Sequence, residues 1–153
     1  IFNNATTPTV STQIGPISAN PNLRESASLI VNEVVGTSSS QLAGDFEVAG
    51  NPADVVIANP NGISIKGVHF INTPKATFTT GVPHMVDGRL ENVAIEKGNI
   101  DVIGAINSPT EQSGSNVYTP TSKVDLLART IRINADVVAQ DAIRAITGRN
   151  TVN

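Results

Sequence analysis

The sequence predicts an all-β protein, and three features support this prediction. Short apolar runs, rich in valine and isoleucine, recur about every ten residues along the 153-residue chain. Asparagine, glycine, aspartate and proline separate the runs, as they do where strands end in turns. Aromatic residues make up only 3% of the chain, which disfavours a sandwich whose sheets are held apart by large rings. The residues alone leave two architectures open, a sandwich or barrel and a parallel β-helix, and asparagine-rich corners favour the β-helix.

The stretch from residue 45 to residue 63 carries the clearest local pattern. Residues 45–48 alternate polar and apolar side chains, which predicts a strand with one buried face. Residues 55–58 form a continuous apolar run that is mostly β-branched, and this is typical of a strand buried on both faces. A turn-forming tetrapeptide follows directly, so the stretch predicts two strands with a sharp change of direction after the second.

That tetrapeptide is Asn59-Pro60-Asn61-Gly62. Asn59 can accept a hydrogen bond from the backbone ahead of it, and Pro60 fixes its own φ at about −65°. Asn61 and Gly62 tolerate the bridge and left-handed conformations that close a tight turn. Ile63 is then expected to re-enter the core.

Further short strands are predicted on both sides of this turn. They cover residues 28–35, 63–68, 76–79 and several pieces between 90 and 106. A flexible loop is expected at 36–40, a loop or hairpin at 81–88, and a polar surface loop at 107–121. Residues 1–19 are expected to be mostly loop, attached to the core through Phe2, Val10, Ile14 and Ile17.

Residues 121–147 contain neither glycine nor proline, and their pattern is ambiguous. Val124, Leu127 and Ile131 have helical spacing, whereas the residues from Ile131 to Val137 alternate with strict period two. The β-branched content and the brevity of each run favour strands over a helix. Three strands are therefore predicted, at 124–128, 130–138 and 142–147.

A related tetrapeptide, Asn20-Pro21-Asn22-Leu23, lies upstream of the first predicted strand. Either tetrapeptide alone indicates only a turn, but several motifs follow in a fixed order. After Leu23 come VNEV at 31–34, EVAG at 47–50, VVIANPNGI at 55–63, FINTP at 70–74 and VDLLAR at 124–129. This order resembles the haemagglutination-activity family, the secretion domain of two-partner-secretion exoproteins such as filamentous haemagglutinins, haemolysins and contact-dependent inhibition toxins.

The resemblance implies a right-handed parallel β-helix with a small antiparallel excursion. It implies one secretion domain over residues 1–153, and the opening sequence is expected to be a fragment that lacks the family's N-terminal cap region. The implied function is to direct export of a large Gram-negative exoprotein. The implied partner is an outer-membrane two-partner-secretion transporter, through its periplasmic domains, and the implied location is outside the cell or on its surface.

Two rival functions stay open at this point. The same β-helix could act as an adhesin that binds host cells or glycans directly, and the host cell surface is an expected partner of a full-length protein. It could also be a polysaccharide-cleaving enzyme, which would need a pair of carboxylates on one face of the coils. The two asparagine–proline turns are the candidate site in the favoured interpretation, because they shape the segment that a transporter would recognise. An equal alternative is that they only set the corners of the coils and need no partner.

The composition argues against most other chemistry. The net charge is −3, so no basic face is available for a nucleic acid backbone, and cysteine is absent. His69 and His84 do not form a metal-ligand pattern, and Ser64 with Lys66 is only a faint match to a nucleophile pair on one strand face. No catalytic residue, metal or cofactor is therefore expected. No apolar run approaches the roughly 18 residues of a membrane-spanning helix.

Overall fold

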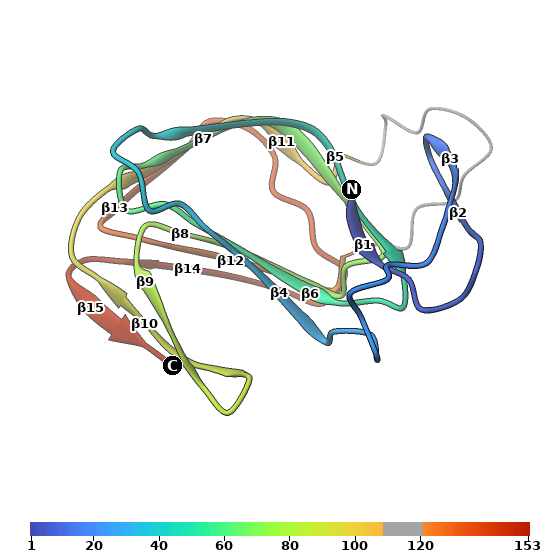
Figure 1. Cartoon of the computed structure of the whole chain (residues 1–153). Helices are drawn as coiled ribbons and strands as arrows, with labels where there is room; N and C mark the ends of the chain where they lie inside the picture. The colour runs from blue at the N-terminus through green and yellow to red at the C-terminus, as the bar shows by residue number, and fades with distance from the viewer. Residues whose placement is uncertain (109–120) are drawn as a thin grey trace.

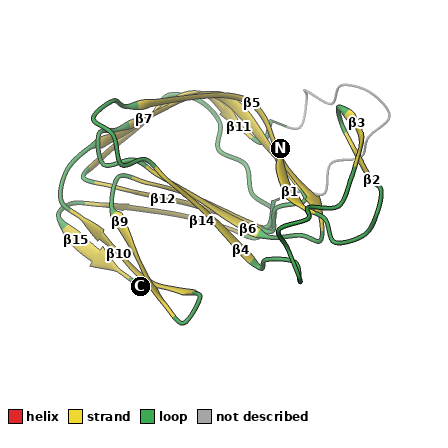
Figure 2. Ribbon diagram, viewed as in Figure 1, coloured by secondary structure: helices red, strands yellow, loops and turns green. Residues whose placement is uncertain are grey.

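The computed structural model describes residues 1–108 and 121–153. All regular structure in these residues is β, and most strands belong to two parallel sheets of five strands each (Figures 1 and 2). None of the described residues forms a helix long and apolar enough to cross a membrane. The predicted surface loop at 107–121 falls almost entirely outside the described residues.

Sheet I contains strands that follow one another in the order β1-β5-β7-β11-β13. Their bounds are β1 Phe2–Asn4, β5 Ser40–Gly50, β7 Ile63–Ile71, β11 Asn99–Ile106 and β13 Thr130–Ile133. Sheet II has the order β14-β12-β8-β6-β4. Its bounds are β4 Leu29–Glu33, β6 Asp54–Ala58, β8 Lys75–Thr79, β12 Lys123–Ala128 and β14 Ala142–Thr147.

The chain alternates between the two sheets, and every pairing within them is parallel. Each passage through sheet I and sheet II therefore makes one coil of a solenoid, and the next coil stacks beside it. The predicted fold, a right-handed parallel β-helix with a small antiparallel excursion, is confirmed.

The core lies between the inner faces of the two sheets. Strand β6 is buried along Val55–Ala58, as its continuous apolar run predicts, because one face meets the core and the other lies under a further layer. Aromatic side chains from three strands meet inside: Phe46 stacks on Phe70 at 5.4 Å between ring centroids, and Phe70 meets Phe78 edge-on at 5.5 Å. Three phenylalanines and many aliphatic side chains thus fill the interior without tryptophan.

The central strands of sheet I are curved (Figure 1). The register shifts between Leu42 and Gly44 in β5 and between Val102 and Gly104 in β11. The three central strands share one register position on each side of the bend. Between these two positions, β5 runs from Leu42 to Gly44, β7 from Ile65 to Val68 and β11 from Val102 to Ile106. From β5 to β7 and from β7 to β11 each coil therefore inserts one more residue, as β-bulges do where a strand turns a corner, whereas the coil of β13 advances from Ile133 to Val137 and matches β11.

Asparagine side chains complete the hydrogen bonding where sheet I passes into sheet II. Asn72 and Asn107 both have positive φ, 60° and 58°, which asparagine tolerates better than most residues. The Asn72 side-chain amide donates to the carbonyl of Val48 at 2.8 Å, and the Phe70 N–H donates to the Asn107 side-chain oxygen at 2.9 Å. These bonds continue the links between coils past the end of the regular ladder, so the expected asparagine-rich corners are present.

The antiparallel excursion forms sheet III, with the order β15-β10-β9. Strands β9 (Val82–Val86) and β10 (Arg89–Ile95) make a hairpin that closes at Asp87 and Gly88, and β15 (Asn150–Val152) pairs with β10. This hairpin confirms the expectation for residues 81–88. A small second core, made of Val93, Ile95, Leu127 and Val152, attaches sheet III to the outer face of sheet II.

The N-terminal prediction was partly wrong. Residues 1–19 contain β1 and the small hairpin of β2 (Val10–Thr12) and β3 (Gly15–Ile17) rather than mostly loop. Phe2 packs against the core as expected, but Ile14 is 80% exposed because it occupies the tip of that hairpin.

Several strand boundaries differ from the prediction, and the differences are largest in β5 and β13. Strand β5 begins at Ser40, so the expected flexible loop ends earlier, because the polar residues 40–41 pair with β7. Strand β13 ends at Ile133 instead of residue 138, and Val137 keeps only an isolated bridge to Ile106. The period-two pattern continues beyond the strand because Ala135 and Val137 still pack on the core.

Candidate functional site

The second asparagine–proline turn is built around the side chain of Asn59, which is completely buried. Its oxygen accepts the N–H of Asn61 at 2.9 Å, and its carbonyl accepts the N–H of Gly62 at 3.1 Å. Its amide donates to the carbonyl of Ser38 at 3.0 Å and to the hydroxyl of Ser40 at 2.8 Å. The predicted hydrogen bond from the backbone to the Asn59 side chain is therefore present, and the same side chain also links the turn to the preceding coil.

Backbone contacts hold this turn between two neighbouring coils. The Asn59 N–H donates to the carbonyl of Thr79 in the following coil, and the Ser40 N–H of the preceding coil donates to the carbonyl of Gly62. Gly62 has φ +116°, a conformation that other residues rarely adopt, and Ile63 is buried in the core. The predicted geometry of Gly62 and Ile63 is confirmed.

The first turn has the same internal hydrogen bonds as the second but is more exposed to solvent. The Leu23 N–H donates to the Asn20 carbonyl at 3.2 Å, and the Asn22 N–H donates to the Asn20 side-chain oxygen at 3.0 Å. The Asn20 amide donates to the carbonyl of Asn3 at 3.0 Å, which ties the turn to the end of β1. Pro21 and Asn22 at its tip are exposed.

The structure does not bring the two turns together. The first is tied to β1, which pairs with the last residues of β5, whereas the second is tied to Ser40, the first residue of β5. Strand β5 has 11 residues, and a strand rises by about 3.3 Å per residue. The turns therefore mark opposite corners of the first coils.

The other candidates from the sequence do not assemble into a catalytic or metal site. His69 Nε2 lies 2.9 Å from the carbonyl of Ser108 and its Nδ1 lies 3.4 Å from Asp45. His84 is on the separate hairpin, 3.4 Å from Glu91. Within residues 1–108 and 121–153, no group of three histidine, aspartate or glutamate side chains could hold a metal ion.

Ser64 and Lys66 lie on β7, but the Lys66 ammonium is engaged elsewhere. It donates to the side-chain oxygen of Gln41 at 2.9 Å, and Gln41 is the cross-strand neighbour of Ser64. Such a bond on the exposed face of a sheet is an ordinary cross-strand contact. The arrangement therefore gives Ser64 no base of the kind that activates a nucleophile.

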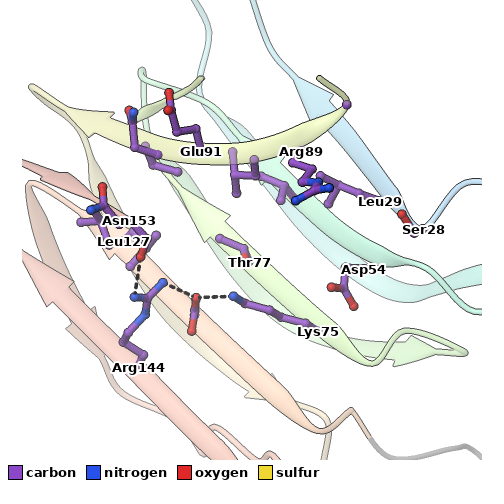
Figure 3. A pocket seen from close by; sticks show the side chains of 17 residues that line it. Ser28, Leu29, Asp54, Lys75, Thr77, Arg89, Glu91, Leu127, Arg144 and Asn153 are labelled. Carbon is purple, nitrogen blue, oxygen red and sulfur yellow. Dashed lines mark hydrogen bonds and ion pairs between the residues drawn. The ribbon is translucent and has the colours of Figure 1, made fainter. Parts of the chain in front are cut away.

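A feature that the sequence did not reveal is a groove between the outer face of sheet II and sheet III, with a volume of about 340 Å³ (Figure 3). Asp125 lies at its floor with a side chain only 7% exposed, 2.7 Å from Arg144 and 3.3 Å from Lys75. The guanidinium of Arg144 also donates to the backbone carbonyl of Asn153 at 3.1 Å. These partners come from β8, β12, β14 and the residue after β15, so no local sequence pattern connects them.

Asp54 contributes a further carboxyl to this floor. Burial raises the pKa of Asp54 above its ordinary value of 3.8, while a backbone hydrogen bond from Lys75 and the charges of Lys75 and Lys123 act in the opposite direction. Asp54 and Val56 line the same groove, as expected for residues on one strand face. None of the nine residues of the two turns lines it.

Comparison with known proteins identifies the family. The family model described as TPS secretion domain matches residues 1–153. The chain belongs to this family. The β-helix and the order of motifs agree with that membership, and a TPS secretion domain is the export module of a two-partner-secretion exoprotein, which leaves the cell through the outer membrane.

Relatives of this TPS secretion domain are very long exoproteins. The chain is 40% identical over 156 residues to the tRNA nuclease CdiA of Yersinia mollaretii, and 36% identical over 155 residues to the filamentous hemagglutinin of Bordetella pertussis. These alignments cover 100% and 98% of the chain but only 5% and 4% of the relatives' length.

A solved structure agrees with the fold. The crystal structure of the filamentous hemagglutinin secretion domain superposes with a TM-score of 0.84 at 33% identity, and it covers 98% of this chain and 49% of that one. The TPS secretion domain described here therefore shares its fold with the secretion domain of a filamentous hemagglutinin.

Proposed function

We propose that residues 1–153 act as one non-enzymatic secretion domain whose two asparagine–proline turns shape the segment that the periplasmic domains of an outer-membrane transporter recognise. The observation that carries this proposal is that different residues of the first turn hold its shape and face the solvent. Asn20 holds the turn by its side chain, whereas Pro21 and Asn22 are exposed at the tip. A preformed turn with an open tip is suited to present side chains to a partner.

The open edge of sheet II supports a second contact with the transporter. Strand β4 is outermost in sheet II, and no strand among the described residues pairs with its other edge. An open edge offers backbone donors and acceptors to which a partner can add a strand. The transporter's periplasmic domain would then contact the first turn and the neighbouring edge of β4 together.

The experiment separates recognition from folding. Asn22→Ala removes an exposed side chain for which the described residues show no hydrogen bond, whereas Asn59→Ala removes a buried one. Both variants would be tested for export in cells that express the cognate transporter, and for binding to its isolated periplasmic domains. The melting temperature of each purified domain would be recorded in parallel.

The expected result is that Asn22→Ala lowers export and binding without changing the melting temperature. Export of Asn22→Ala at the parent level, together with unchanged binding, would contradict recognition at this turn. Reduced export only in variants that also melt at lower temperature would assign the turns a purely structural role.

A further inference from the structure

We propose that the groove between sheets II and III binds an extended polypeptide segment that carries one basic and one acidic side chain. The proposal is independent of transporter recognition, since none of the turn residues lines the groove. It rests on the length of the groove, on the charges inside it and on the kind of side chains that line it.

The groove is elongated along the axis of the β-helix. Its floor contains residues at or beside five adjacent strands of sheet II, and its wall is the hairpin of sheet III (Figure 3). Adjacent strands are about 4.8 Å apart, so the floor extends over about 19 Å. An extended polypeptide rises by about 3.3 Å per residue, so about six residues fit along this floor.

Two charged side chains in the groove have no salt bridge among the described residues. Asp54 lies on the floor between Ser28 and Lys75, and Arg89 extends from the wall toward Leu29 (Figure 3). The remaining charges are engaged: Asp125 binds both Lys75 and Arg144, and Glu91 faces His84 on the outside of the hairpin. Asp54 takes a backbone hydrogen bond from Lys75 but forms no salt bridge, and its sign is opposite to that of Arg89, so the two side chains complement a ligand that carries both signs.

The other lining residues favour a polypeptide over other polymers. Leu29, Val56, Leu90 and Leu127 provide apolar contacts, and Thr77 and Asn92 provide hydrogen-bonding groups. No lining residue is aromatic, so neither bases nor sugar rings find a stacking surface. Carboxylates on the floor disfavour a polyanion. An extended peptide uses all three kinds of contact, because its side chains alternate and its backbone amides lie between them.

The test uses the folded 153-residue domain and fluorescein-labelled hexapeptides of valine and serine. Each peptide contains one lysine and one glutamate, separated by zero to three residues, and a control peptide has glutamine at both positions. Fluorescence anisotropy at low salt is expected to show at least tenfold tighter binding for one spacing than for the control peptide. Asp54→Asn and Arg89→Gln should each weaken that binding at least tenfold, and added salt should weaken it further.

Two controls keep the result specific. Glu96→Gln removes a charge that pairs with Arg149 on the surface and does not line the groove, so peptide affinity should be unchanged. Melting curves show whether each variant is folded. Equal affinity for charged and uncharged peptides, or no effect of Asp54→Asn and Arg89→Gln in folded protein, would overturn the proposal. Binding of polygalacturonate instead, strengthened by Asp54→Asn, would assign the groove to an acidic polysaccharide and would overturn it as well.

Discussion

Gly98 packs directly against the turn of the neighbouring coil: a Cβ atom built on Gly98 would lie 2.7 Å from the carbonyl oxygen of Pro60. The same atom would lie 2.7 Å from the side chain of Thr80. Gly98 immediately precedes β11, so the entry of one coil touches the asparagine–proline turn of the coil before it. Close packing of this kind makes the turn sensitive to a residue that is distant in sequence.

Replacing Gly98 with alanine is expected to destabilise the domain by about 2–4 kcal/mol, because a positive φ of +93° and a steric clash both oppose the new methyl group. Gly148→Ala is the matched control, since Gly148 has a similar φ of +100° but open space around it. Urea unfolding should show a loss of only about 1–2 kcal/mol for this control. Equal losses of unfolding free energy in the two variants would show that the close contact with Pro60 does not contribute to the destabilisation.

Asn59→Ala should cost more stability than Asn20→Ala, although both residues close the same kind of turn. Asn59 is fully buried and loses bonds to Ser38, Ser40 and Asn61 together, so a loss of about 2–4 kcal/mol is expected. Asn20 is half-buried, and water can replace part of its bonding, so about 1 kcal/mol is expected. Chemical denaturation of both variants measures the difference, and a larger loss at Asn20 would reverse the ranking.

The turns show how much of the molecule follows from the sequence. The buried run of β6, the geometry of Gly62 and the return of Ile63 to the core are all decided by residues within a few positions of one another. Local sequence patterns report such features well, because the responsible interactions are local. The fold class followed from the recurrence of these patterns and from the family resemblance.

Features that depend on distant partners were missed. Strand β5 begins at Ser40 because the backbone there pairs with β7, and nothing in the polar residues 36–41 indicates that partner. The groove has the same origin, since Asp54, Lys75, Asp125 and Arg144 lie on four different coils. Only the stacking of coils, with the hairpin folded over sheet II, brings them to one surface.

Asp125→Ala should destabilise the domain by about 1–3 kcal/mol, because it leaves the cations of Lys75 and Arg144 without their shared carboxylate. The pair of Arg149 and Glu96 is a suitable comparison, since its distance is also 2.7 Å but both side chains are largely exposed. Glu96→Gln should change stability by less than about 0.5 kcal/mol. Similar effects of the two substitutions in thermal unfolding would show that burial of Asp125 has no energetic consequence.

Asp54→Asn should raise the melting temperature slightly at neutral pH. Burial raises the pKa of Asp54 in the folded protein above 3.8, so the folded state binds this proton more tightly than the unfolded state does. Ionisation of Asp54 therefore lowers the stability of the parent as the pH rises from 3.8 through the higher pKa of the folded state. Asparagine does not ionise and avoids this cost.

The advantage of Asp54→Asn should disappear in acid, where Asp54 of the parent is protonated and also uncharged. Melting curves of both proteins at pH 3 and pH 7 test this predicted pH dependence of the stability difference. A variant that is less stable than the parent at pH 7 would show that the charges of Lys75 and Lys123 outweigh the burial of the carboxyl group.

The residue gained at the bend from β5 to β7, and again from β7 to β11, gives this part of the solenoid a direction. Coils of unequal perimeter cannot exchange places, so a strand displaced by one whole coil would meet a partner of the wrong length. Uniform solenoids lack this protection against slipping by one repeat. In this secretion domain the register of the three central coils is therefore written into the lengths of their own strands.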